Sequence, residues 1–359
     1  GGMRTSPAAS PPPPNSLERF TERRVYASES GSDAAIGWVA DYERELARAW
    51  RVRWAPYVYW KAAPYRGTHI QIDDDGLRRT WRAPSEAKDP FRIFVFGGST
   101  TWGRGARDDR TIPSFVAKAL AMEPAVPAVV TNFGQSGWVS TQEVIALELE
   151  LRRGNLPDVV VFYDGVNDVF SAYQSDVAGI PQNESKRQLD FESFERAAVA
   201  RLLDRLAVVR VARRLVAGHP LAPPVARSPS DRSALATGIV DAYEGNMDIV
   251  TAHASRCEFR PLFFWQPVVW SKAGRTELEA EVVDAFAPLR PLYDATYGEV
   301  RSRPSLRARE SFADVSDALD VFDGSAYVDH CHVTETANAA IASRIASRIR
   351  SILETPAHD

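Results

Sequence analysis

Four short motifs rich in glycine and polar residues occur in this chain, and each of the first three directly follows a run of apolar residues. They are Phe96–Thr101, Asn132–Gly137, Gly165–Asp168 and Asp329–His332. An apolar run that ends at such a motif is typical of a strand buried on both faces of a parallel sheet. Because the carboxyl ends of parallel strands meet at one edge of the sheet, motifs far apart in the sequence can lie together. The pattern therefore predicts a parallel α/β sheet.

Strands and helices are expected to alternate from Phe91 onward. The expected strands are Arg92–Phe96, Ala128–Asn132, Val159–Tyr163, Arg260–Trp265 and Leu319–Phe322. The expected helices cover 112–123, 141–152, 233–255, 277–298 and 335–353, and the fourth of these is expected to break near Pro288 and Pro291.

The rest of the chain divides by composition. Residues 1–16 begin like a cloning remnant and are rich in proline, which predicts a disordered linker. Residues 17–88 carry helical spacing and many aromatic residues, so we expect an N-terminal extension that packs on the core. Residues 89–355 form the expected main domain. Within it, 169–232 reads as an insertion, either lid-like or a solvated excursion.

Composition excludes some classes of protein. The chain has 359 residues, of which 45% are apolar and 25% charged, with a net charge of −4, so a basic nucleic-acid-binding face is not expected. No apolar run is long enough to span a membrane. The two cysteines, Cys257 and Cys331, show no metal-ligand spacing, and a disulfide between them stays open. Localisation also stays open: extracytoplasmic if a signal or anchor was trimmed, otherwise cytoplasmic.

The first three motifs each have a chemical and a purely structural interpretation. Ser99 follows two glycines that permit a sharp turn after a strand, which would expose its hydroxyl at the sheet edge. The same turn could hold a phosphate, although the lysine of a P-loop is absent. Gly134 and Gly137 could expose N–H groups to a ligand, and Asn167 could donate from its amide. Each of these motifs alone could equally be an ordinary turn.

The fourth motif decides between these interpretations. The spacing of Asp329 and His332 places both side chains on one side of a turn, so the carboxylate can accept the Nδ1–H and leave Nε2 as a base. His330 is adjacent, but its offset of one residue from Asp329 makes that hydrogen bond harder. A nucleophile, an oriented base and a set of donors are the parts needed for acyl transfer through a serine ester.

Taken in this order, the four motifs resemble those of the SGNH (GDSL-like) hydrolase family over roughly Phe91–Leu353, outside the insertion. Ser99 matches the nucleophile of that family, Gly137 the glycine, Asn167 the asparagine and His332 the base, with Asp329 as the acid. Gly98 stands where the namesake motif has aspartate, as in G-G-S-T variants of the first block. In that family the glycine donor lies five residues after the asparagine of the second block, which here selects Gly137 over Gly134.

The resemblance implies a three-layer α/β/α sandwich with a flavodoxin-like five-stranded parallel sheet. It also implies a Ser-His-Asp triad and an oxyanion hole formed by Ser99, Gly137 and Asn167, with no metal or organic cofactor. The expected function is that of a serine esterase acting on a small acyl ester, for which an acetyl ester of a carbohydrate is the preferred case. Trp102, Trp138 and Gln266 are candidate substrate contacts, and the two tryptophans could equally be core residues.

Three alternatives use the same residues differently. An acyltransferase would use the triad with a carbohydrate hydroxyl in place of water. A metal-dependent phosphodiesterase would use Asp164, Asp168, Asp329, His330 and His332 as ligands and would tolerate Ser99→Ala. A non-catalytic binding module would have no need to retain every one of these side chains.

Overall fold

The computed structural model describes residues 24–27, 37–84, 88–122, 124–203 and 228–354 of the chain, and for 194–203 it describes the backbone alone. Its centre is a five-stranded sheet with the order β6-β5-β7-β8-β9, in which every pair of neighbours is parallel. The strands are β5 (Phe91–Gly97), β6 (Ala128–Asn132), β7 (Val159–Asp164), β8 (Arg260–Trp265) and β9 (Phe312–Asp314). This is the flavodoxin-like order that the family resemblance implied.

The sheet is buried because its strands are nearly continuous apolar runs. All six residues of β7 are buried, and the rings of Phe96, Phe162 and Phe263 stack across neighbouring strands at centroid distances of 5.3 and 5.2 Å. Such cross-strand contacts stabilise a sheet through the apolar area that they remove from water.

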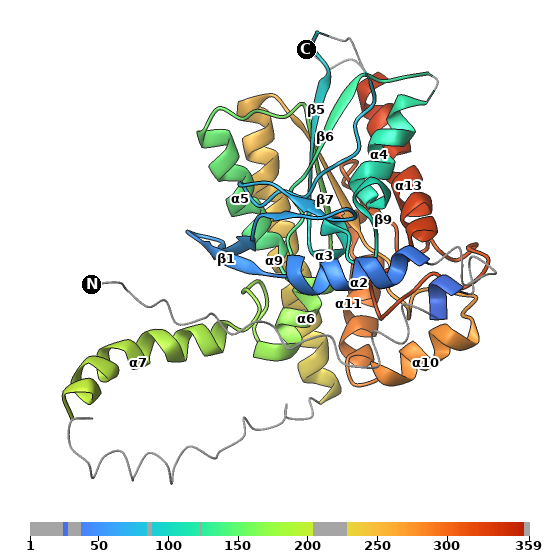
Figure 1. Cartoon of the computed structure of the whole chain (residues 1–359). Coiled ribbons are helices and arrows are strands. Elements are labelled where there is room, and N and C mark those ends of the chain that lie inside the picture. Colours follow the sequence, from blue (N-terminus) through green and yellow to red (C-terminus); the bar gives the residue numbers. More distant parts are fainter. Residues whose placement is uncertain (1–23, 28–36, 85–87, 123, 204–227, 355–359) are drawn as a thin grey trace.

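Helices cover both faces of the sheet (Figure 1). On one face lie α4 (Ile112–Ala121) and α13 (Glu335–Glu354), which pack against each other, and on the other lie α5 (Ser140–Arg152) and α9 (Pro229–Cys257). The expected break near Pro288 and Pro291 is confirmed, because α10 (Glu277–Ala285) ends and α11 (Arg290–Ser302) begins there. The short α12 spans Pro304–Arg307.

The expected fifth strand, Leu319–Phe322, is wrong. The strand that pairs with β8 is Phe312–Asp314, where Phe312 lies opposite Phe263. Leu319–Phe322 instead forms a turn closed by the bond from the Phe322 N–H to the Leu319 carbonyl, and Val321 is 92% exposed. An edge strand of this kind is short and only partly buried, so its sequence lacks the apolar run that identified the other strands.

The segment before the sheet contains α2 (Gly37–Ala49), the hairpin of β1 (Val52–Ala55) with β2 (Tyr59–Ala62), and the pair of β3 (Tyr65–Arg66) with β4 (Gln71–Ile72). After β4, Arg78 forms single bridges to Ile72 and to Asn132 at the end of β6. Trp60 Nε1 donates to the Ser136 carbonyl at 2.8 Å, so the hairpin lies directly on the loop after β6.

Helices occupy most of the described part of the predicted insertion. The helix α6 (Val166–Ser175) continues into it, and α7 (Glu184–Leu203) follows after the segment 176–183. The expected linker 1–16 lies outside the described residues, as does 204–227 within the insertion.

Candidate active site

The sheet topology brings the first three motifs to one edge. Ser99 is the first residue of α3 (Ser99–Trp102), directly after β5, while Gly137 follows β6 and Asn167 follows β7. The strand β5 lies between β6 and β7, so the chain runs from β5 to its neighbour on one side and then to its neighbour on the other. This is the switch point at which open α/β sheets form their ligand sites.

The loop before α13 adds the fourth motif. Ser99 Oγ lies 2.7 Å from Nε2 of His332, and Nδ1 of His332 lies 2.6 Å from Oδ2 of Asp329. Ser99 is 9% exposed, His332 6% and Asp329 3%, so the three form a hydrogen-bonded chain that is nearly shielded from water. With Asp329 as acceptor for Nδ1–H, Nε2 can take a proton from the hydroxyl.

Asp329 is held by more than the imidazole. Its Oδ1 accepts the backbone N–H groups of Cys331 and His332 at 2.9 and 2.8 Å, and Oδ2 also lies 3.2 Å from Nη1 of Arg104. Burial by itself would raise the pKa of Asp329, but the charge and hydrogen bond of His332, together with Arg104, hold that pKa well below its usual range. The carboxylate is therefore ionised at neutral pH. Sequence reasoning did not assign Arg104 a role here.

His330 lies in a different environment. Its ring packs among Trp270, Phe286 and Tyr293 at centroid distances of 5.9, 4.7 and 6.0 Å. Burial lowers the pKa of His330 to about 4, despite the opposing attraction of Asp329. This histidine is neutral at physiological pH and makes no contact with Ser99 among the contacts of the described residues.

Asn167 is positioned as a donor next to Ser99. Its Nδ2 donates to the Trp138 carbonyl at 2.8 Å, and its Oδ1 accepts from Nε2 of Gln182 at 3.2 Å. An amide nitrogen carries two hydrogens, so one is left for a ligand. A Cβ added to Gly98 would lie 2.0 Å from this Nδ2, so glycine at position 98 leaves the space that the amide occupies.

The two glycines after β6 behave differently. The Gly134 N–H donates to Asn132 Oδ1 at 2.9 Å and is therefore occupied. The Gly137 N–H has no acceptor in the described part of the chain, and Gly137 adopts a φ of +74°, which favours glycine. As first residue of its helix, Ser99 also has an N–H without an intrahelical acceptor. Gly137 therefore stays the candidate donor, whereas the N–H of Gly134 is occupied.

The three candidate substrate contacts have different locations. Trp102 is 2% exposed, packs edge-to-face on Trp50 at 5.1 Å and lines a cavity beside Gly137. Trp138 is 1% exposed and donates from Nε1 to the Trp60 carbonyl at 2.9 Å. The Gln266 side chain accepts from Thr100 at 3.0 Å. Trp138 and Gln266 therefore make internal contacts and do not belong to the lining of that cavity.

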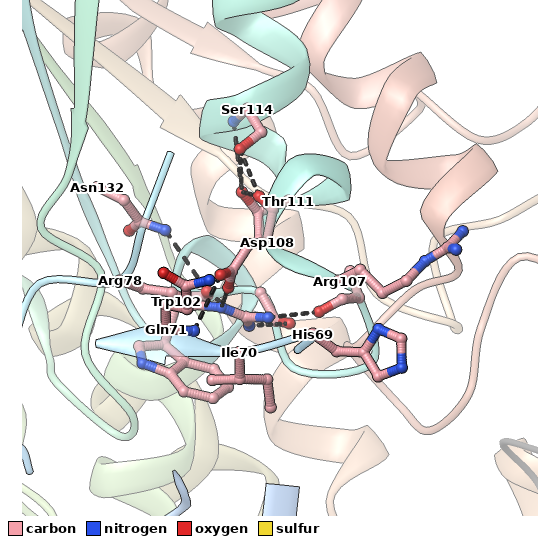
Figure 2. A network of polar contacts seen from close by, with 12 residues as sticks. His69, Ile70, Gln71, Arg78, Trp102, Arg107, Asp108, Thr111, Ser114 and Asn132 are labelled. Atoms are coloured by element: carbon pink, nitrogen blue, oxygen red, sulfur yellow. Dashed lines mark hydrogen bonds and ion pairs between the residues drawn. The ribbon is translucent and has the colours of Figure 1, made fainter. Parts of the chain in front are cut away.

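A buried arginine from the N-terminal segment holds the turn that follows Ser99 (Figure 2). Arg78 donates to the carbonyls of Trp102, Gly103 and Ala106 at 3.1, 2.6 and 2.6 Å, and its Nε lies 2.9 Å from Asp108. The side chain of Arg78 is 0% exposed, so losing it would leave buried acceptors unpaired. No motif in the sequence identified this contact.

Two of the five ligands of the metal-dependent alternative, Asp164 and Asp168, are engaged with other partners. Asp168 accepts from Ser140, and Asp164 lies with Glu143 in the interior, where burial raises the pKa of both carboxyl groups well above the usual range. One set in the described residues has metal-ligand spacing, with atoms of Asp329, His330 and Cys331 within 4.8 Å of one another. Both oxygens of Asp329 already accept hydrogen bonds, so this set does not offer a free carboxylate.

Two further features are the state of the cysteines and the apolar character of the helices. Cys257 and Cys331 are free thiols, and Cys331 is buried. Within the described residues, no helix combines the length and the apolar character that crossing a membrane would require.

Comparison with known proteins adds to this geometry. No curated protein matches the sequence. The chain is similar to the acetyl xylan esterase AlAXEase (12% identity, 73% of this chain and 100% of that one, TM-score 0.39). It is likewise similar to the lipase Lip_vut3 from a goat rumen metagenome (12% identity, 73% of this chain and 96% of that one, TM-score 0.41). A third similar structure is Est24, a carbohydrate acetylesterase from Sinorhizobium meliloti (13% identity, 73% of this chain and 99% of that one, TM-score 0.38).

The model of one sequence family matches residues 95–278, which is more than half of the chain and includes the first three motifs. Its members are carboxylic ester hydrolases, and the parallel α/β sheet described above agrees with that class. The chain therefore belongs to the GDSL-like lipase/acylhydrolase family.

Proposed function

We propose that this esterase hydrolyses a small acyl ester through an acyl-enzyme formed on Ser99, with His332 as base and Asp329 as the acid that orients it. The observation that carries the proposal is the unbroken chain from Ser99 Oγ to His332 Nε2 (2.7 Å) and from His332 Nδ1 to Asp329 Oδ2 (2.6 Å). These are the distances at which a base can accept the proton of a nucleophile.

The first half of the reaction forms the acyl-enzyme. Ser99 Oγ attacks the ester carbonyl carbon while its proton passes to Nε2 of His332, and Asp329 stabilises the resulting imidazolium. The negative charge that develops on the carbonyl oxygen is met by the N–H groups of Ser99 and Gly137 and by the Asn167 amide. The tetrahedral intermediate then breaks its bond to the alcohol oxygen, which leaves with the proton from His332.

The second half uses the same groups with water. His332 takes a proton from a water molecule, whose oxygen attacks the acyl carbon of the ester on Ser99. Collapse of this second intermediate releases the carboxylic acid and returns the proton to Ser99 Oγ. Besides the ester and water, these steps use side chains and N–H groups of the chain. A carbohydrate hydroxyl could replace water in this half, which is the acyltransferase alternative.

The test is hydrolysis of p-nitrophenyl acetate and butyrate by wild type and Ser99→Ala, each measured with and without EDTA. We expect wild-type activity that the substitution reduces by several orders of magnitude, because the nucleophile is lost. Activity that survives in Ser99→Ala, or that EDTA abolishes in wild type, would contradict the proposal. Product analysis with added carbohydrate then separates hydrolysis from transfer, since transfer yields an acylated sugar.

A further inference from the structure

A cavity of about 240 Å³ lies beside the proposed oxyanion donors. Three parts of the chain line it: the end of α2 with the β1–β2 hairpin, the loop after β6 together with Trp102 of α3, and the start of α7. The first and third parts are the N-terminal segment and the predicted insertion. This cavity is thus built largely by segments outside the four motifs.

Contacts with Gly137 and Asn167 connect the cavity to the proposed oxyanion donors. Gly137, whose N–H is unoccupied, is part of the lining. Gln182 is also part of it and bonds Asn167, the second proposed donor, at 3.2 Å. Trp102 lies one helical turn after Ser99 on α3, so both side chains leave the helix on the same side.

The lining of the cavity lacks the groups that must face the leaving alcohol. The alcohol leaves with a proton from His332, so the alcohol must face that residue. Neither His332 nor Asp329 belongs to the lining, whereas Gly137 does. A group that extends from the carbonyl carbon past the oxyanion donors is therefore the acyl group.

Two polar side chains of the lining, those of Gln135 and Arg187, are occupied within the protein, whereas Nε1 of Trp102 is a buried donor with no partner in the described part of the chain. Both ends of the Gln135 amide are bonded, its Oε1 to the Ala62 N–H at 2.7 Å and its Nε2 to the Gly76 carbonyl at 2.9 Å. Arg187 lies 2.8 Å from Glu184 and stacks over Tyr59.

Much of the surface that this cavity offers to a ligand is aromatic or aliphatic. The lining includes the side chains of Trp50, Trp60, Trp102, Ala49 and Ala62. Apolar and aromatic surface of this kind favours an apolar ligand, because contact with it removes that surface from water.

We propose that this cavity is the acyl pocket and that it accepts a group larger than acetyl, namely a straight chain of about four to eight carbons or one aromatic ring. The size of the acyl group follows from the volume of the cavity, since 240 Å³ holds about eight groups the size of a water molecule at roughly 30 Å³ each. This proposal rests on the proposed function and specifies its acyl group. It assigns selectivity to the N-terminal segment, which supplies Trp50, Trp60 and Ala62.

The first experiment measures kcat/KM for p-nitrophenyl acetate, butyrate, hexanoate, octanoate, dodecanoate and benzoate. We expect a rise of up to about fourfold for each methylene from acetate to hexanoate, as each methylene leaves water. A decline is expected at dodecanoate, which exceeds the cavity. A preference for acetate, or no dependence on chain length, would overturn the proposal.

The second experiment fills the cavity. Ala62→Leu, and separately Val52→Trp, should lower kcat/KM for hexanoate about tenfold or more and leave that for acetate within about threefold. Val52 is 39% exposed, so its substitution is tolerable for folding even if Ala62→Leu is not. Arg53→Trp is the matched control, because successive residues of a strand point to opposite faces and Arg53 is not part of the lining. Equal losses on both esters would contradict an acyl pocket.

A binding measurement separates this proposal from the proposed function. Tryptophan fluorescence of Ser99→Ala is titrated with hexanamide and acetamide, which need no catalysis. Saturable binding of hexanamide that Val52→Trp weakens at least fivefold supports the pocket even if Ser99 proves not to be the nucleophile. Absence of hexanamide binding, in a protein whose esterase activity depends on Ser99, would overturn the pocket alone.

Discussion

The replacement Asp329→Asn tests the orientation of His332 with almost no change in shape. In the structure, Oδ1 of Asp329 accepts two backbone N–H groups, from Cys331 and His332 at 2.9 and 2.8 Å. An asparagine would keep its oxygen at that position, because an NH₂ group cannot accept. Its NH₂ would then face Nδ1 of His332 at the present Oδ2 position, 2.6 Å away.

An amide donor in that place reverses the tautomer of the imidazole. Nδ1 must then accept, Nε2 carries the hydrogen, and the ring can no longer take the proton of Ser99 Oγ. The same NH₂ would face Arg104, which loses its carboxylate partner at 3.2 Å. We expect kcat to fall by about 10⁴, as for the corresponding change in other serine hydrolases, which corresponds to about 5.5 kcal/mol of transition-state stabilisation.

The assay is steady-state hydrolysis of p-nitrophenyl butyrate at pH 8, with thermal unfolding measured on the same samples. Asp323→Asn, at an exposed position of the loop between β9 and α13, is the control and should match wild type. Folded Asp329→Asn protein with a loss below about tenfold would refute the reasoning, since the tautomer would then not depend on Asp329.

Three further predictions concern residues around the site. Gly98→Ala should lower kcat by about 10²–10³ because a Cβ 2.0 Å from the Asn167 Nδ2 displaces this donor, and Gly274→Ala, with open space around it, is the control; equal kcat values would contradict the donor role. Burial raises the pKa of Glu143, so the folded state keeps a proton that the unfolded state releases above its ordinary pKa, and wild-type stability should fall as pH rises. The free energy of unfolding, measured with urea at pH 5 and at pH 8, should therefore fall less for Glu143→Gln than for wild type. An equal fall in the two proteins would argue against a retained proton. Burial lowers the pKa of His330 to about 4 in the folded state. As pH falls, His330 is therefore protonated in the unfolded state before the folded state, and wild-type stability should decline as pH falls from about 6.5 toward 4. His330→Phe should reduce that decline in acid unfolding curves, and an unchanged acid sensitivity would show that other groups cause it.

Much of the fold could be predicted from local patterns. Four of the five strands are apolar runs that end in glycine or polar motifs, so β5 to β8 were located within one or two residues. The fifth, β9, has three residues and an intermediate burial, and its identity depends on pairing with β8 and not on its own composition. A short edge strand carries too few apolar residues to be recognised without its neighbour.

The candidate site shows the same division. The spacing of Asp329 and His332 is local, so the sequence could indicate their hydrogen bond, and the order of motifs along parallel strands indicated that Ser99 would meet them. The contact of Arg104 with Asp329 and that of Gln182 with Asn167 could not be read in this way. Nothing in the spacing of these pairs marks them as partners, because each depends on how a loop returns to the sheet edge.

By itself, the sequence determined the class of sheet, the order of its motifs and the side chains that could carry acyl chemistry, because strand burial and short-range spacing are written in local residue patterns. Only the tertiary structure decided which N–H is unoccupied at Gly137, how Arg78 holds the turn after Ser99, and which segments enclose the cavity beside it. Those features arise from packing between residues distant in the chain, where side-chain shape and available space select the partners and no periodic pattern records the choice.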